Sequence, residues 1–133
     1  MEIVSDIDKL ESIRSMQSTI RKLENGLAKM TQQDANTTLI KKRLKASYIG
    51  LAMLENAWNQ KAHNYSREDI EEARNVLTGL FPSIGNSFAK LKAGSPQRTL
   101  LERRIKALEL TVQAIDDISS QDVSNKLERS VVH

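Results

Sequence analysis

Apolar residues recur at spacings of three or four positions in four stretches of the chain. From Met16 onward the first stretch keeps a 4-3-4-3 spacing, which is the seam of a heptad repeat. The four stretches span residues 6–32, 37–64, 66–93 and 96–119, and short polar or Gly- and Pro-containing segments separate them. Matched lengths and short connections favour antiparallel neighbours. The sequence therefore predicts an all-α protein, an antiparallel up-down-up-down four-helix bundle with long helices.

Residues that cap helices stand where these stretches begin and end. Ser5 and Ser66 each precede an acidic first turn, as N-cap residues commonly do. Between the third and fourth stretches, Gly94 suits the position just past a helix, Ser95 the next N-cap and Pro96 the first helical position. The capping residues thus predict the same helix boundaries as the apolar pattern.

Pro82 lies inside the third stretch, whose apolar pattern keeps its phase across the proline. A proline within a helix removes one hydrogen bond and clashes with the preceding turn, so we expect one helix kinked at Pro82. The alternative is a break near Gly79–Pro82 with a second short helix after Ser83. Beyond the fourth stretch the pattern weakens. We therefore expect a single four-helix domain over residues 1–119 and a C-terminal tail over residues 120–133 that is flexible or forms a short helix.

Composition narrows the class of protein. Of the 133 residues, 39% are hydrophobic and 28% are charged, values typical of one soluble domain. The chain has no cysteine, which excludes disulfides, thiolate metal sites and a cysteine nucleophile. No apolar run approaches the ~20 residues of a membrane span, and the first residues lack a signal-peptide pattern. We therefore expect a cytoplasmic protein without a membrane span.

The net charge is only +3, but the predicted bundle gathers charge at two ends. In an up-down topology, residues 17–48 and 80–106 meet at one end and carry a net charge of +10. Residues 2–16, 49–79 and 107–122 meet at the other end and carry a net charge of −8. Cations near the N-termini of the second and fourth helices oppose the helix dipole. They indicate either a binding surface or simple neutralisation of the carboxyl ends of the neighbouring helices.

The basic end is the candidate partner-binding surface. The residues that we expect to make the contact are Lys41, Lys42, Lys45, Arg103 and Lys106. They would face an acidic patch on a partner protein. The alternative is a nucleic acid bound at the same end through its phosphates, although no aromatic stacking platform accompanies the cations. Opposite charges at the two ends also permit self-association, so a homodimer stays open. Met53 falls off the main apolar stripe and is predicted to face a partner.

The sequence contains no catalytic or metal-binding pattern. Di-metal sites in helical bundles use Glu-x-x-His pairs, and neither His63 nor His133 follows a glutamate at that spacing. A Gly-rich phosphate loop is also lacking. We expect no enzymatic activity, no metal and no cofactor. The sequence therefore predicts a small non-enzymatic helical interaction protein, such as an adaptor, chaperone, inhibitor or immunity-type factor, that docks through its basic end.

Overall fold

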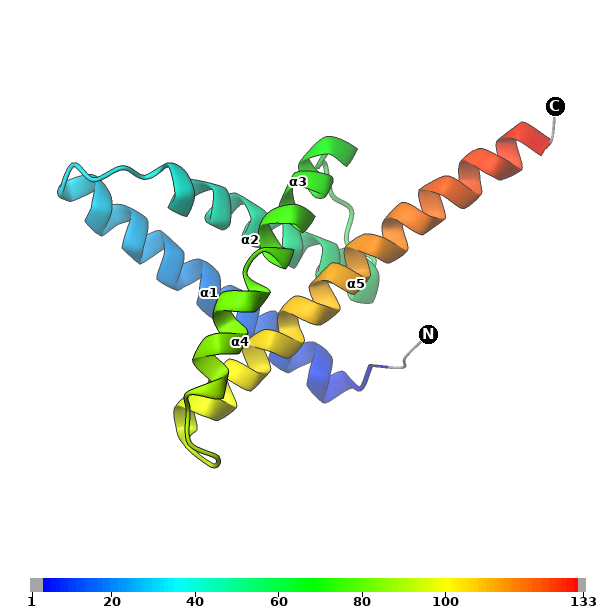
Figure 1. Ribbon diagram of the computed structural model, residues 1–133. Coiled ribbons are helices and arrows are strands. Elements are labelled where there is room, and N and C mark those ends of the chain that lie inside the picture. Colours follow the sequence, from blue (N-terminus) through cyan, green and yellow to red (C-terminus); the bar gives the residue numbers. More distant parts are fainter. Residues whose placement is uncertain (1–3, 132–133) are drawn as a thin grey trace.

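The computed structural model describes the backbone of residues 4–131 and the side chains of residues 4–118. Its helices are α1 (Asp6–Gln32), α2 (Thr38–Asn59), α3 (Arg67–Thr78), α4 (Phe81–Ala89) and α5 (Pro96–Val131). No strand occurs within residues 4–131. The prediction of an all-α protein is confirmed, and Figure 1 shows how the five helices cross.

Helices α1 and α2 form an antiparallel hairpin (Figure 1). The hydroxyl of Tyr48 donates a hydrogen bond of 2.8 Å to the carboxylate of Glu24. Nearer the core, Met16 on α1 lies against Gly50 on α2. Of these two contacts, the one with the lower residue number on α1 has the higher number on α2, as expected for antiparallel helices. The connection between the helices includes Asp34 in the left-handed region, with φ of 59°, a conformation that aspartate tolerates better than most residues.

The third predicted helix is two helices in the structure. Helix α3 ends at Thr78, and α4 begins at Phe81 with Pro82 in its first turn. The kinked single helix is therefore not confirmed, and the break lies where the alternative placed it. The reason is local, because a proline in a first turn lacks only an N–H that has no partner inside the helix anyway.

The core forms where α1, α2, α3 and α5 cross. Its buried apolar side chains are Met16, Ile20, Ala46, Ile49, Met53, Leu54, Ile70, Ala73, Leu77, Ala107, Leu108, Leu110, Ala114 and Ile115. The prediction that Met53 faces a partner is wrong, because its side chain is fully buried in this core. Helix α4 contributes no buried residue and packs mainly on α5. There the guanidinium carbon of Arg98 lies 4.3 Å from the centroid of the Phe88 ring.

The up-down-up-down arrangement of four helices is not confirmed. Two ion pairs join the early part of α5 to the first turns of α1, namely Arg103–Glu11 at 3.8 Å and Lys106–Asp8 at 3.1 Å. An up-down bundle of matched helices would instead bring the start of the last helix beside the end of the first. The α1–α2 turn and the α4–α5 turn consequently lie at different ends of the molecule (Figure 1).

Helix α5 is one continuous helix to Val131, where the sequence predicts a separate tail from residue 120 onward. Its C-terminal part extends beyond the other helices in Figure 1. The side chains of residues 119–133 lie outside the described part of the structure.

Candidate partner-binding surface

The outer half of the α1–α2 hairpin projects from the core. Residues 21–45, which we call the basic arm, include no buried residue. The core begins immediately on either side of the arm, at Ile20 on α1 and at Ala46 on α2. The turn at the tip of the arm lies at the left edge of Figure 1, well away from α5. The arm is therefore anchored at its base and open to solvent along its length.

The arm carries most of the excess positive charge of the protein. Its seven basic residues are Arg21, Lys22, Lys29, Lys41, Lys42, Arg43 and Lys45, and all seven are exposed. Glu24 and Asp34 are its two acidic residues, so the arm has a net charge of +5. The whole chain has +3, and the remaining residues therefore sum to −2. Among the side chains of residues 4–118, only Lys45 of the seven lies within 4.0 Å of a carboxylate.

An apolar seam runs between these cations. Its members are partly buried rather than enclosed: Leu23, Leu27, Met30, Ile40 and Leu44. The helices approach closely at Gly26, where a Cβ atom would lie 3.0 Å from Cδ1 of Ile40. Beside the seam, Leu39 is 58% exposed on the first turn of α2. Two helices alone cover each other's apolar stripe from one side, which leaves part of this seam in contact with water.

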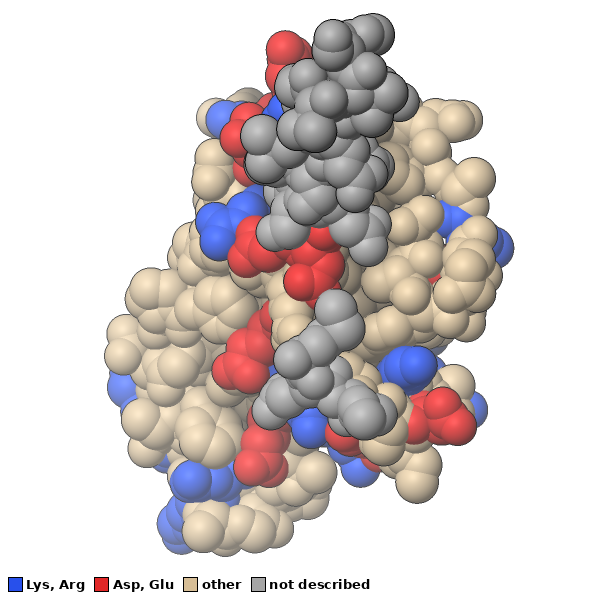
Figure 2. Space-filling model, turned by 90° about the vertical axis from the view of Figure 1, so that its right-hand side faces the viewer, with Lys and Arg blue, Asp and Glu red and all other residues tan. Residues whose placement is uncertain are grey.

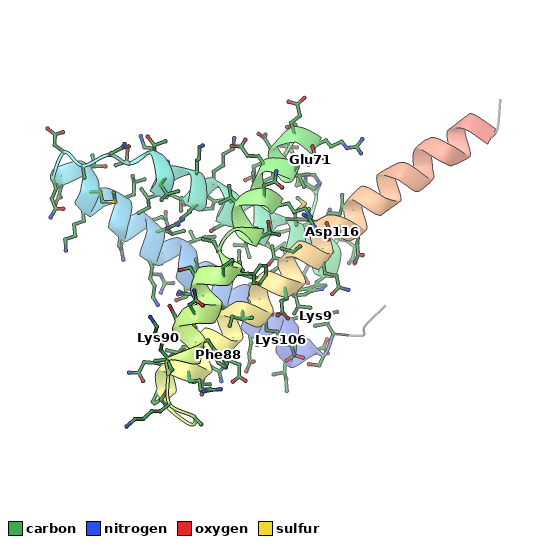
Figure 3. The ribbon with its side chains drawn as sticks, viewed as in Figure 1. Lys9, Glu71, Phe88, Lys90, Lys106 and Asp116 are labelled. Atoms are coloured by element: carbon green, nitrogen blue, oxygen red, sulfur yellow. The ribbon has the colours of Figure 1, made fainter. Side chains whose placement is uncertain are left out.

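The structure divides the five predicted contact residues between two places. Lys41, Lys42 and Lys45 lie on the basic arm. Arg103 and Lys106 lie on α5 and pair with acids of α1 (Figure 3 shows Lys106 where α5 crosses the N-terminal part of α1). The predicted separation of charge into two opposite ends is wrong, because the first turns of α1 were assigned to the end opposite these cations.

A third ion pair contradicts the predicted separation of charge into two ends. The ammonium group of Lys45 lies 3.2 Å from the carboxylate of Asp69, which belongs to the first turn of α3 and was assigned to the opposite end. The hydrogen bond from Lys45 and a second one from Ser66 lower the pKa of Asp69 below its ordinary value of 3.8. At the other contact, the hydrogen bond from Lys106 lowers the pKa of Asp8 in the same way. These cations thus hold acidic first turns against neighbouring helices.

Sequence reasoning selected Lys41, Lys42 and Lys45 but omitted four other cations of the arm. Arg21, Lys22 and Lys29 belong to α1, and Arg43 belongs to α2. A signal for the three cations of α1 was present, because they flank the regular heptad seam that begins at Met16. The apolar pattern does not show where along the α1–α2 hairpin the packing of α3 and α5 ends.

The opposite side of the molecule is different in character. Figure 2 shows carboxylates of aspartate and glutamate gathered along the middle of that face. Within residues 4–118, no three histidine, aspartate or glutamate side chains are grouped so that they could hold a metal ion. In the part of the chain that the structure describes, no helix combines the length and apolar character needed to cross a membrane.

Comparison with known proteins adds no relative. No protein-family model, no curated protein and no solved structure matches this chain.

Proposed function

We propose that this is a small non-enzymatic interaction protein that docks an acidic amphipathic helix of a partner protein on the basic arm. One observation carries the proposal: a projecting segment without a buried residue combines a net charge of +5 with a partly open apolar seam. Docking of this kind is how adaptors, chaperones, inhibitors and immunity-type factors act.

The shape of the arm favours a helix as the bound element. Two packed helices leave a groove between their exposed flanks, and a third amphipathic helix placed there buries its own apolar stripe against the seam. Leu39, which is 58% exposed and precedes the seam residue Ile40, offers an apolar anchor for such a helix. A few such anchors commonly supply most of the binding energy of an interface.

The charge of the arm selects the chemistry of that helix. Cations from both α1 and α2 flank the seam, so acidic residues on the two flanks of a bound helix would meet opposite charges on both sides. Complementary charges of this kind speed association and discriminate against basic partners. The contact would therefore weaken as the salt concentration rises.

A nucleic acid is the rival occupant of the same cations. Phosphate contacts would use the lysines and arginines but not the apolar seam or Leu39. Residues 21–45 include no aromatic residue, and Tyr48, three residues beyond the arm, has its hydroxyl bonded to Glu24 rather than placed for base stacking. These features favour the helix over the nucleic acid.

Binding of designed peptides tests the proposal directly. One peptide of about 18 residues carries leucine at heptad seam positions and glutamate on both flanks, and a second peptide has the same composition in scrambled order. We expect the amphipathic peptide to bind at least about tenfold more tightly than the scrambled one, measured by fluorescence anisotropy at two salt concentrations. The variant Leu39→Ser should weaken binding of the amphipathic peptide, although it alters no charge.

Matched charge reversals locate the surface. Lys41→Glu with Lys42→Glu should weaken binding of the amphipathic peptide by at least about tenfold. Lys90→Glu with Lys92→Glu changes the net charge equally at the exposed α4–α5 turn, and this variant should bind like the wild type. Equal affinity for the amphipathic and the scrambled peptide would mean that only charge drives binding, and it would contradict docking of a helix on the apolar seam. Tighter binding of DNA, with log affinity falling linearly with log salt, would favour the nucleic acid.

A further inference from the structure

A cavity of about 250 Å³ lies between the first turns of α3, the α2–α3 connection and the middle of α5. That volume corresponds to about eight water molecules at the density of the liquid. It is smaller than the ~300–1,000 Å³ of pockets for drug-sized ligands, so its occupant would be a small metabolite. The cavity is remote from the tip of the basic arm.

The connection that forms one wall is held in place by its own contacts. The side-chain amide of Asn56 donates a hydrogen bond of 2.8 Å to the carbonyl of Lys61. The ammonium group of Lys61 lies 2.8 Å from the carboxylate of Glu55. Further along, the rings of His63 and Tyr65 stack with centroids 6.4 Å apart and planes 19° from parallel. The wall is therefore a structured part of the fold that presents two flat rings to the cavity.

The lining has an apolar side and a charged side. Ile70, Ile115 and Ile118 form the apolar side together with the two rings. The charged side comes from α3, where Arg67, Glu71 and Arg74 line the cavity at spacings of four and three residues, so that they share one face of the helix.

The charged side carries both signs in balance. Arg74 is fixed by Asp116 on α5, with Nε 2.6 Å from Oδ1 and Nη2 3.3 Å from Oδ2. These two bonds use two of the five N–H groups of a guanidinium and leave three for a ligand. Figure 3 shows Glu71 and Asp116 on the two helices that flank the cavity. Asp116, which does not itself line the cavity, offsets the charge of Arg74, so within residues 4–118 Arg67 and Glu71 leave one unpaired charge of each sign in the lining.

We propose that this cavity binds a small zwitterion with an apolar body, which is the chemistry of an α-amino acid with a branched or aromatic side chain. The guanidinium groups of Arg67 and Arg74 would receive the carboxylate, and Glu71 would receive the ammonium group. The three isoleucines and the stacked rings would cover the apolar side chain. A ligand with a single charge would leave one sign of the lining without a partner.

Three probes with one common body test the role of each charge. L-phenylalanine is a zwitterion, 3-phenylpropanoate lacks the ammonium group, and 2-phenylethylamine lacks the carboxylate. With isoleucine methyl groups labelled for NMR, we expect L-phenylalanine to shift the signals of Ile70, Ile115 and Ile118 saturably and to leave those of Ile20 and Ile40 unmoved. Both singly charged probes should bind about fivefold or more weakly.

Charge-removing variants assign the partners within the cavity. Arg67 and Glu71 are exposed, so Arg67→Gln and Glu71→Gln should leave the helical circular dichroism unchanged. Each variant should weaken the binding of L-phenylalanine by about fivefold. Glu71→Gln should leave the affinity for 3-phenylpropanoate unchanged, and Arg67→Gln should leave the affinity for 2-phenylethylamine unchanged. Arg43→Gln, on the arm, is the matched control and should change nothing. Absence of saturable methyl shifts with L-phenylalanine, or equal affinity for all three probes, would overturn the proposal.

Discussion

At the scale of single residues, the close packing of the core depends on Gly50. A Cβ atom at this position would lie 2.8 Å from Cγ2 of Thr111 and 3.2 Å from both Cδ1 of Leu77 and Cε of Met16. These neighbours belong to α5, α3 and α1, so three helices approach α2 at the one residue that has no side chain. Thr111 is itself fixed, because its hydroxyl donates a hydrogen bond of 2.6 Å to the carbonyl of Ala107.

The substitution Gly50→Ala should therefore destabilise the protein. Alanine favours a helix over glycine by about 1 kcal/mol, but overpacking of a tight core costs about 1–3 kcal/mol. We expect a net loss of about 1–2 kcal/mol in the free energy of unfolding, measured by urea denaturation. The added substitution Thr111→Ser removes Cγ2 but keeps the hydroxyl, and it should recover part of that loss.

A second glycine provides the control for the first. Gly85 lies within α4, and no atom stands within 4 Å of a Cβ built there. The substitution Gly85→Ala should therefore leave stability unchanged or raise it by up to about 1 kcal/mol. A stable Gly50→Ala variant with unchanged helix content would show that the four helices do not pack as closely as described.

At the scale of the elements, ion pairs between helices depend on acidic first turns. Ser5 and Ser66 cap α1 and α3 by accepting hydrogen bonds of 3.1 Å from the backbone N–H groups of Asp8 and Asp69 respectively. The side chains of the same two aspartates accept hydrogen bonds from Lys106 and Lys45. Each aspartate thus belongs to a capped helix start and to a contact with another helix. Local chemistry and tertiary packing meet at these two residues.

These contacts predict a loss of stability in acid. The pKa values of Asp8 and Asp69 are lowered in the folded protein. Their contribution to the stability of the fold is therefore present above pH 3.8, the ordinary pKa, and is lost as the pH falls through the lower folded-state pKa values. The double variant Lys45→Gln and Lys106→Gln should be less stable than the wild type at pH 7. The difference should shrink as the pH falls through the folded-state pKa values of the two aspartates, because a protonated carboxyl group no longer pairs with a lysine.

Urea unfolding at several pH values measures this difference. Lys22→Gln with Lys29→Gln makes the same change of charge on the arm, where neither lysine lies within 4.0 Å of a carboxylate of residues 4–118. This control should show no loss of stability relative to the wild type at pH 7. A constant difference between the Lys45/Lys106 variant and the wild type at every pH would contradict the assignment.

The elements were also the part of the structure that the sequence predicted well. The caps at Ser5 and Ser66 and the proline at the start of α5 are local signals, and the structure places helix starts at each of them. The break before Pro82 is also local, and it appeared as the alternative. How α5 lies against α1 could not be predicted, because it depends on side chains far apart in sequence, such as Met16 and Thr111, that meet around Gly50.

At the scale of the whole molecule, the incorrect packing of α5 against α1 in the predicted bundle also changed which residues were expected to form the binding surface. An up-down bundle would cover the whole length of α1 with the last helix, whereas the buried residues of α1 are Ser12, Met16 and Ile20 only. The rest of α1 and the start of α2 therefore stand apart from the core as the basic arm. The cations of α2 belong to that arm, whereas Arg98, Arg103 and Lys106 of α5 contact other helices within the fold.

An arm with a net charge of +5 repels itself, and this repulsion gives the surface a cost in stability. Lys41 and Lys45 are four residues apart on one helix face, where like charges destabilise, and α2 has no acid in its first turn. Lys41→Glu with Lys42→Glu should therefore raise the free energy of unfolding by about 0.3–1 kcal/mol at low salt, although the same change is expected to weaken docking. Residues kept against the stability of their own helix are typical of a binding site.

Thermal unfolding at low and high salt separates this expectation from a general effect of charge. The melting temperature of the Lys41/Lys42 variant should exceed that of the wild type at low salt, and the gap should narrow as salt screens the repulsion. Lys90→Glu with Lys92→Glu makes an equal change of net charge just after α4, where cations favour the helix dipole, so it should give no increase. A lower melting temperature for the Lys41/Lys42 variant would mean that these lysines stabilise the fold, which would contradict their retention for a partner.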